Sequence, residues 1–443
     1  MAKNKKEMTP EERLAAALVP EEEQPYELPE GWEWVRLGGI AEIVRGGSPR
    51  PIKSFLTTED TGVNWIKIGD GERYGKYITS TAQKIITTGM SKSRFVHSGT
   101  LLLSNSMSFG RPYILKIDGC IHDGWLAIFD YEKLFNQNYL YYLLCSPLLY
   151  NQFASKAAGA VVQNLNKDKV KASLVPLPPL YEQQRLVARI ESLFVKLDAA
   201  KEKVQSVLDS HETRKAALLH DAFAGKLTAK WRDGQSTKSF SWKPISFEDC
   251  IEKMQNGLSK RKGDAGEYVN VLRLTNIAPE GLSFQDMRKI LLTSDEKEKY
   301  KLAPEDVLMV RVNGSKDNVG KQLYIDKKDA DNQLTFCDHL IRIHYNEQLV
   351  APQFMVYFSH TMQYKSYVEK NMVSSAGQNT ISRKGMKNLS LMLPSLPEQQ
   401  EIVRILGRLL AREQRARQAA EETLTVIDRM KQAILARAFR GEL

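Results

Sequence analysis

Two stretches of the chain place apolar side chains three and four residues apart, the spacing of one face of an α-helix. The first covers residues 182–223, which contain neither proline nor glycine, and Gly225 then supplies a helix stop. The second covers residues 393–443. About forty residues at 1.5 Å each make a helix of roughly 60 Å, so we expect the two helices to pack on each other as a coiled coil. The residues expected to form this helix seam are Ile190, Leu197, Val204, Leu406, Ile427 and Ile434.

The rest of the chain alternates short apolar runs with turn residues, a pattern typical of β-strands. Strands are predicted over residues 64–68, 101–103, 113–117, 125–129, 269–274, 307–312, 323–325 and 340–343. Helical patches are predicted over residues 139–153 and 352–368. Because each half has both kinds of element, we predict two compact α+β domains rich in polar loops.

The chain is an internal duplication. Residues 177–184 read LPPLYEQQ, and residues 393–400, 216 positions later, read LPSLPEQQ. The same offset places Leu219 on Leu435, Phe223 on Phe439 and Gly225 on Gly441. Each half therefore consists of a diverged domain followed by a similar helix. The predicted segments are an acidic N-terminal extension (1–27), a first variable domain (28–176), a central helix (177–230), a second variable domain (231–392) and a C-terminal helix (393–443).

Charge favours a polyanionic partner. The 443 residues carry a formal net charge of +10, although the first thirty residues hold only four basic residues against eight acidic ones. The basic remainder favours nucleic acid, and plain solubility is the alternative explanation. The sequence has no apolar run of about 18 residues and no secretory leader pattern, so we expect a cytoplasmic protein. Its four cysteines are too scattered to predict a disulfide framework or a zinc site.

No motif for catalysis was found. The seven histidines form no H-E-x-x-H pattern, and the Gly-Lys pairs lack the spacing of a phosphate-binding loop. His122-Asp123 and Asp338-His339 lie at corresponding places in the two halves. They could be metal or catalytic pairs, or simply histidines whose hydrogen bonds are satisfied. We expect no catalytic residue, no metal and no cofactor on this chain.

The loops instead carry residues suited to DNA. Arginine and lysine pair with phosphate or with guanine edges, whereas asparagine and glutamine suit adenine. Such residues recur at similar places in the two halves, although solvated turn residues would look the same one at a time. The candidate DNA-binding residues are Arg45, Arg50, Lys53, Asn105, Ser106, Arg111, Gln163, Asn164, Lys260, Arg261, Lys262, Arg311, Asn313, Ser315, Lys316, Gln378 and Asn379.

Several of these motifs together resemble the specificity subunit of type I restriction-modification systems. The motifs are PLPPLYEQQ at 176–184, LPSLPEQQ at 393–400, the helix ends AFAGKL at 222–227 and AFRGEL at 438–443, and LPEGW at 28–32. The resemblance implies two target-recognition domains separated by two long antiparallel helices, in a pseudo-twofold arrangement. Each domain would read one half of a bipartite site in double-stranded DNA, and the helices would set the gap.

The resemblance also implies partners. Two modification (methyltransferase) subunits would dock on the helices, and restriction (motor and nuclease) subunits would join them. S-adenosylmethionine, ATP and Mg²⁺ would be held by those subunits and not by this chain. The acidic segment before Leu28 departs from the family's core pattern.

Two alternatives stay open on the residues alone. One is a coiled-coil scaffold that does not read DNA, and the other is a methyltransferase or nuclease that acts by itself. Salt-sensitive binding to duplex DNA would argue against the scaffold, because phosphate contacts weaken steeply with salt. Methyl transfer or cleavage by the purified chain alone would be needed for the second.

Overall fold

The computed structural model describes residues 9–72, 75–105, 110–157, 165–235, 241–278 and 281–443. The chain divides into two compact units. Unit 1 comprises Met1–Gln205 and Glu422–Leu443, and unit 2 comprises Ser206–Glu421. Each unit therefore contains one variable domain and a part of each long helix. Among the described residues, no helix is long and apolar enough to cross a membrane.

Unit 1 is built on two five-stranded sheets and a two-stranded ribbon. One sheet has the order β2-β11-β8-β9-β5, the other β3-β6-β4-β10-β7, and the ribbon pairs β1 with β12. The strands are β1 (Glu33–Arg36), β2 (Glu42–Arg45), β3 (Leu56–Thr57), β4 (Val63–Ile66), β5 (Tyr77–Ile78), β6 (Lys84–Ile85), β7 (Arg94–Val96), β8 (Leu101–Ser104), β9 (Pro112–Leu115), β10 (Gly119–Ile121), β11 (Trp125–Phe129) and β12 (Leu174–Leu177). The helices are α1 (Pro10–Ala17), η1 (Glu21–Glu23), α2 (Leu37–Ile40), η2 (Ile52–Ser54), η3 (Ile68–Asp70), η4 (Thr87–Lys92), α3 (Gln137–Leu144), α4 (Pro147–Ala157), α5 (Lys167–Lys171) and α6 (Leu180–Asp209).

Unit 2 repeats this topology in part, with smaller sheets. Its main sheet has the order β14-β23-β19-β21, and β18-β15-β22, β16-β17, β20-β25-β24 and β13-β26 form smaller sheets. The strands are β13 (Lys243–Ser246), β14 (Ile251–Asn256), β15 (Glu267–Leu272), β16 (Ile277–Ala278), β17 (Gly281–Leu282), β18 (Arg288–Leu292), β19 (Val307–Val310), β20 (Val312–Asn313), β21 (Gln322–Tyr324), β22 (Leu334–Phe336), β23 (Leu340–Tyr345), β24 (Val373–Ser375), β25 (Gln378–Thr380) and β26 (Ser390–Leu393). The helices are α7 (His211–Phe223), α8 (Ala229–Asp233), η5 (Leu274–Asn276), α9 (Ser294–Tyr300), η6 (Lys316–Asn318), α10 (Lys327–Ala330), α11 (Pro352–Phe358), α12 (Met362–Asn371), α13 (Arg383–Met386) and α14 (Leu396–Ala438), the last of which is shared with unit 1.

The main sheet of each unit is buried on both faces, which explains the continuous apolar runs of its central strands. In unit 1, Leu101 and Leu103 of β8 face the core under α3 and α6, whereas Leu102 faces the core around β4 and β10. In unit 2, Val307 and Met309 of β19 alternate with Leu308 in the same way. All eight predicted strands are present, with ends shifted by up to two residues.

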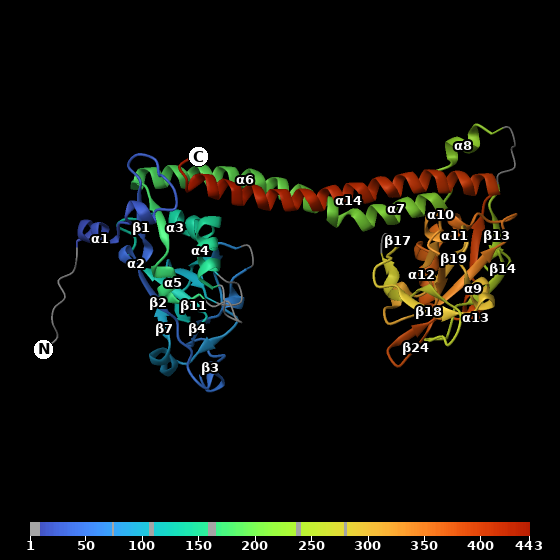
Figure 1. Ribbon diagram of the computed structural model, residues 1–443, viewed down its shortest axis with the longest axis horizontal. Helices are drawn as coiled ribbons and strands as arrows, with labels where there is room; N and C mark the ends of the chain where they lie inside the picture. The colour runs from blue at the N-terminus through green and yellow to red at the C-terminus, as the bar shows by residue number, and fades with distance from the viewer. Residues whose placement is uncertain (1–8, 73–74, 106–109, 158–164, 236–240, 279–280) are drawn as a thin grey trace. The chain divides into compact units, whose positions relative to one another are not determined.

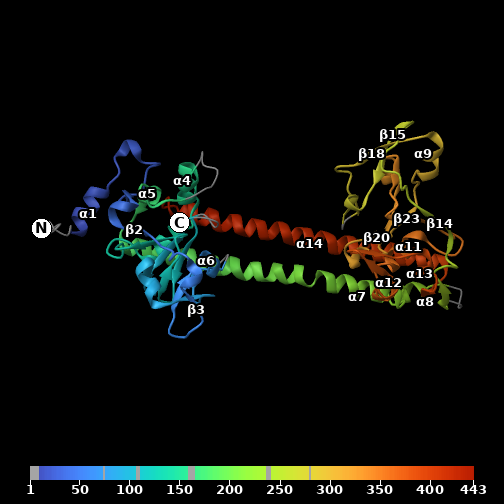
Figure 2. The same ribbon diagram turned by 90° about the horizontal axis from the view of Figure 1, so that it is seen from below.

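The long helices lie against the domains of their own units. In unit 1, α6 and the C-terminal part of α14 run side by side (Figure 1). Lys201 pairs with Asp428 at 3.1 Å and Arg185 donates to the Leu443 carbonyl at 2.8 Å, so the two helical segments run antiparallel there. In unit 2, Arg214 of α7 pairs with Glu413 of α14 at 2.7 Å. Figure 2 shows β15, β18 and α9 on the side of unit 2 away from α7.

The predicted central helix is present over residues 180–223, with one irregular position. The helix divides at Ser210 into α6 and α7. The Ser210 hydroxyl donates back to the Ser206 carbonyl at 2.7 Å, and Arg214 donates to the Val207 carbonyl at 3.1 Å. Side-chain donors at these carbonyls compete with the regular helical hydrogen bonds. No proline or glycine marks this break, so composition did not reveal it.

The acidic N-terminal segment packs into unit 1 from α1 onward. Ala17 and Val19 are buried, and Leu18 forms an isolated bridge with Val35. The Tyr26 hydroxyl donates to the Phe439 carbonyl at 2.9 Å. Residues 9–27 are therefore part of the unit 1 fold and not a separate appendage.

Candidate nucleic-acid interface

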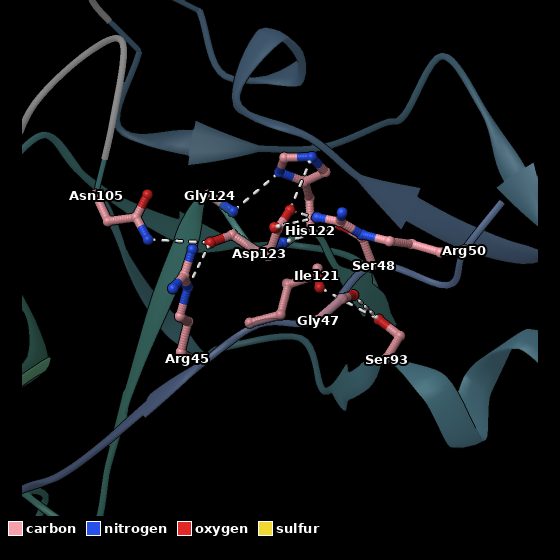
Figure 3. A network of polar contacts seen from close by, with 10 residues as sticks. All are labelled: Arg45, Gly47, Ser48, Arg50, Ser93, Asn105, Ile121, His122, Asp123 and Gly124. Atoms are coloured by element: carbon pink, nitrogen blue, oxygen red, sulfur yellow. Dashed lines mark hydrogen bonds and ion pairs between the residues drawn. The ribbon is translucent and has the colours of Figure 1, made fainter. Parts of the chain in front are cut away.

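Three loops of unit 1 meet beside the end of β2 (Figure 3). The Gly46 amide donates to the Trp125 carbonyl at 2.9 Å, and the Gly47 amide donates to the Ile121 carbonyl at 3.1 Å. The backbone amide of Asn105, directly after β8, donates to the Gly124 carbonyl at 2.9 Å. These backbone bonds hold the glycine-rich loop, the β8 end and the 122–124 turn together. The candidate residues Arg45, Arg50 and Asn105 are thereby gathered at one place.

Asp123 is the centre of this cluster. Its Oδ1 accepts a hydrogen bond from the Ser48 hydroxyl at 2.7 Å and lies 3.1 Å from His122 Nε2. Its carbonyl accepts from Arg45 Nε at 2.9 Å and from Asn105 Nδ2 at 3.0 Å. Burial alone would raise the pKa of Asp123, but the Ser48 hydrogen bond, the adjacent His122 ring and the charge of Arg45 hold that pKa below its ordinary value. The carboxylate therefore holds Ser48 and His122, while the backbone carbonyl of the same residue holds Arg45 and Asn105.

Both ring nitrogens of His122 have partners within the domain. Its Nδ1 accepts the Gly124 amide at 2.9 Å, which leaves Nε2 to donate toward Asp123. Its ring also packs edge-to-face on Trp65, with centroids 5.9 Å apart. Of the two explanations for the His122-Asp123 pair, these contacts favour the satisfied structural histidine.

The glycine in the first loop is required by close backbone approach. A Cβ on Gly46 would lie 2.2 Å from the His122 carbonyl oxygen, and one on Gly257 would lie 2.1 Å from the Cys337 carbonyl oxygen. No side chain fits at such a distance. Gly46 and Gly257 are therefore equivalent positions, and each lets one loop cross another.

Unit 2 repeats the crossing with different side chains. The Gly257 amide donates to the Leu340 carbonyl at 3.1 Å, and the Arg311 amide donates to the His339 carbonyl at 2.8 Å. Arg311 thus occupies the place of Asn105, and Asp338 that of Asp123. In the described part of the chain, the Arg311 guanidinium has no hydrogen bond or ion pair. Among the same residues, one group could hold a metal: Cys337, Asp338 and His339, whose ligand atoms lie within 4.8 Å of one another.

The other candidate residues of the second half fall into two groups. Arg311, Asn313 and Asn379 are brought together by the pairing of β20 with β25. The Asn379 side chain donates to the Gly314 carbonyl at 2.9 Å and accepts from the Ser374 hydroxyl at 2.6 Å, so it supports this hairpin. Exposed residues around it are Ser315, Lys316 and Gln378. The second group follows Gly257: Lys260 pairs with Glu296 at 2.8 Å, whereas Arg261 and Lys262 are exposed.

The remaining candidates of the first half are spread out. Arg50 is exposed and lies 3.8 Å from Asp123, and Lys53 is exposed in η2. Arg111 is partly buried, and its backbone pairs with Ser104. Ser106, Gln163 and Asn164 lie outside the described residues. Nothing in the sequence indicated that Ser48 is hydrogen-bonded to Asp123. The corresponding placement of Asp123 and Asp338 in the two halves was the one feature that pointed to this aspartate.

The seam residues lie along the helices within each unit. Ile190 and Leu406 are completely buried in the unit cores, and Ile427 is almost so. Ile434 packs partly buried on the core of unit 1. Leu197 and Val204 are partly buried.

Known proteins resemble this chain along most of its length. The family model for the type I restriction modification DNA specificity domain matches residues 29–208 and 244–422. The StySPI specificity subunit of Salmonella potsdam is 28% identical, over 94% of this chain and 90% of the relative. The EcoKI specificity subunit of Escherichia coli K12 is 25% identical over the same shares.

Two solved structures share the fold. A chain from a structure concerned with complex assembly and conformational transition of the type I R-M system aligns with a TM-score of 0.69, at 21% identity, over 95% of this chain and all of that one. The HsdS subunit of Thermoanaerobacter tengcongensis aligns with a TM-score of 0.57, at 20% identity, over the same shares. The predicted α+β architecture, with two similar domains and long antiparallel helices, is confirmed by these folds.

Proposed function

The chain belongs to the type I restriction-modification DNA specificity family, and we propose that each of its two domains reads one half of a bipartite site in double-stranded DNA. As a specificity subunit it is non-catalytic, and its contribution to the enzyme is DNA sequence recognition. The alternative of a scaffold that does not read DNA finds no support in the family to which the chain belongs.

One observation carries the proposal of two different half-sites. The two units build the same loop crossing from backbone hydrogen bonds, yet present Asn105 in one and Arg311 in the other. An arginine with free donors suits the O6 and N7 atoms of guanine. Asn105 is buried and its side-chain amide already donates to the Asp123 carbonyl, so unit 1 presents no free side chain at this position. The shared backbone would place both domains on DNA alike, and the differing side chains would select different bases. Basic residues beside each crossing, such as Arg50 and Lys316, would contact phosphate.

The helices would set the distance between the half-sites and dock partners. In this proposal two modification subunits bind the exposed helix faces, and restriction subunits join them. S-adenosylmethionine, ATP and Mg²⁺ would be held by these partner subunits. The duplicated helix motif supports two copies of one partner, because similar surfaces bind similar partners.

The first experiment identifies the site. Adenine methylation is mapped in cells that contain the complete system and in cells that lack this chain. Loss of methylation at one motif of two short blocks with a fixed gap is expected. An unchanged pattern in a system whose other subunits are active would contradict the proposed role.

The second experiment assigns the domains. Arg311→Ala, reconstituted with the modification subunits, should weaken binding to duplexes that keep only the second half-site by roughly 10- to 100-fold, since one bidentate base contact contributes about 1–3 kcal/mol. Binding to duplexes that keep only the first half-site should be unchanged. Lys328→Ala is the control, because it removes one positive charge from an exposed position of α10 in the same unit. Equal losses at both half-sites would overturn the assignment of Arg311.

A further inference from the structure

Unit 2 contains a cavity of about 510 Å³ between its helices and its domain. Its walls come from α7, α14, the loop before β21 and the junction of α11 with α12. Leu219, Val319 and Leu410 give it an apolar part, and the Tyr357 hydroxyl lies beside Gly407. This volume lies in the range of small-ligand sites in proteins.

Positive charge is concentrated at this cavity. Lys215, Lys321 and Lys365 line it from three different elements. Burial lowers the pKa of Lys321, and the nearby charges of Lys215 and Lys365 lower it further. None of the three ammonium groups forms an ion pair within the described part of the chain. Glu413 also lines the cavity, but Arg214 already binds it at 2.7 Å, and only Asp317 adds a second carboxylate.

The corresponding place in unit 1 is neutralised. Glu191 accepts hydrogen bonds from Lys76 and from the Tyr142 hydroxyl, both at 3.1 Å. Two helical turns further along α6, Asp198 forms an ion pair with Lys431. Both carboxylates lie on the helix face turned toward α14 and the domain, and each holds one ammonium group.

The 216-residue offset shows how unit 2 differs at these positions. It places Gly407 at the position of Glu191 and Gln414 at that of Asp198, while Lys215 keeps the position of Lys431. A Cβ on Gly407 would lie only 3.0 Å from the Tyr357 hydroxyl, so a glutamate there would also have to displace this tyrosine. Unit 2 thus has neither acid at these positions, whereas both units have the lysine. The result is an open cavity with unbalanced positive charge.

We propose that this cavity of unit 2 binds a phosphate-bearing anion. A group with two or more negative charges would relieve the mutual repulsion of Lys215, Lys321 and Lys365, and phosphate oxygens can accept from all three. The phosphate would belong either to a small polyphosphate or to the DNA backbone. The proposal does not depend on which bases the domains read.

Pyrophosphate is the probe for the first test. Isothermal titration of the full chain should detect one site in the wild-type protein. Gln414→Asp returns the carboxylate that unit 1 has beside its lysine, and Lys321→Gln removes one ammonium group. Each should weaken pyrophosphate binding by roughly tenfold or more, because one charge contact at this range contributes on the order of 1–3 kcal/mol. Lys431→Gln, the same change at the equivalent helix position of unit 1, is the control and should bind as wild type does.

Competition with DNA identifies the source of the phosphate. If random-sequence duplex displaces pyrophosphate, and Gln414→Asp reduces the salt-dependent duplex affinity, the phosphate is that of DNA. If pyrophosphate binds equally well to the DNA-bound chain, the ligand is a small polyphosphate. The proposal is overturned if the wild-type chain takes up no pyrophosphate, or if wild type and a correctly folded Gln414→Asp chain bind it alike. Half-site selection by Arg311 can fail or succeed independently of either result.

Discussion

Each long helix is joined to its domain by a Glu-Gln pair. The glutamine makes the same contacts in the two units, whereas the glutamate before it makes different ones. Gln183 accepts the Asn136 amide at 2.7 Å and donates to the Leu134 and Pro178 carbonyls, both at 2.8 Å. Gln399 makes the matching three bonds to Ala351, Leu349 and Pro394 in unit 2, all at 2.9 Å. Both side-chain amides are buried, and buried polar groups need hydrogen-bond partners. Each glutamine therefore joins its helix to the domain with all of its polar atoms paired. This explains why the glutamine survives in both copies.

The preceding glutamates have separate roles. Glu182 is paired with Arg185 one turn away at the surface. Glu398 is completely buried, accepts from the Thr228 hydroxyl at 2.7 Å and binds Arg232, with Trp242 Nε1 at 3.3 Å. The difference teaches that sequence identity between repeats does not imply the same role. The role follows from what the next segment of chain places beside the residue.

The largest difference between the units is expected from removing these glutamates. Glu398→Ala should lower the free energy of unfolding of unit 2 by roughly 3 kcal/mol, because it removes the buried acceptor of the Thr228 hydroxyl and of the partly buried Arg232. Glu182→Ala should cost less than about 1 kcal/mol, as is usual for an exposed ion pair. Urea unfolding of both variants, followed by tryptophan fluorescence, measures this. Equal losses would mean that the two joints are energetically alike.

Acid should distinguish the units next. Burial, and then the charges of Lys215, Lys321 and Lys365, lower the pKa of His360 from 6.5 to about 4. The neutral imidazole is favoured in the folded state, so this stability is present above pH 6.5 and is lost as the pH falls toward 4. Between pH 7 and pH 5 the loss is about 2 kcal/mol.

Urea unfolding at several pH values provides the measurement. His360→Gln should remove this part of the pH dependence. Cys145 occupies the equivalent place in unit 1, and burial raises its pKa to about 12, so it does not titrate in this range. Cys145→Ser is therefore the control and should keep the wild-type slope. A slope unchanged by His360→Gln would contradict the buried neutral histidine.

The smallest expected difference is in the sign of the stability change when the matching lysines, Lys431 and Lys215, are replaced. Lys431 binds Asp198 and lies over the Phe194 ring at 5.0 Å, so Lys431→Gln should destabilise unit 1 by about 0.5–1 kcal/mol. Lys215 at the matching position faces other lysines, so Lys215→Gln should be neutral or stabilise unit 2 by a few tenths of a kcal/mol. Thermal unfolding at low salt resolves the two directions. High salt should shrink both differences, since it screens these charges.

Much of the fold could be predicted from periodicity. The short apolar runs of β8 and β19 and the three-and-four spacing in α6 and α14 report local geometry, and the elements formed where those patterns lie. The irregularity at Ser210 within the central helix depends on side-chain hydrogen bonds, including one from Arg214, which periodicity does not report. The helical patches at 139–153 and 352–368 were each split in two for a similar reason. Ser146 and Thr361 return hydrogen bonds to carbonyls three residues back, at 2.6 and 2.7 Å.

The candidate DNA-binding residues were chosen by residue type, and their identity as base or phosphate contacts stays a prediction. The structure adds which of them meet. Arg45 and Asn105 join at the Asp123 carbonyl, although sixty residues separate them in the chain. Asn379 is drawn into its own hairpin instead.

The sequence by itself determined the duplication, the amphipathic helices, the strands and the family, because these are written in repeats and in local periodicity. Only the tertiary structure decided which loops cross at Gly46 and Gly257, and that Glu398 is buried where Glu182 is not. It alone also revealed that α14 lines a cavity with Lys215, Lys321 and Lys365 where α6 carries two paired acids. These outcomes depend on contacts between residues far apart in the chain, and such contacts leave no periodic mark in the sequence.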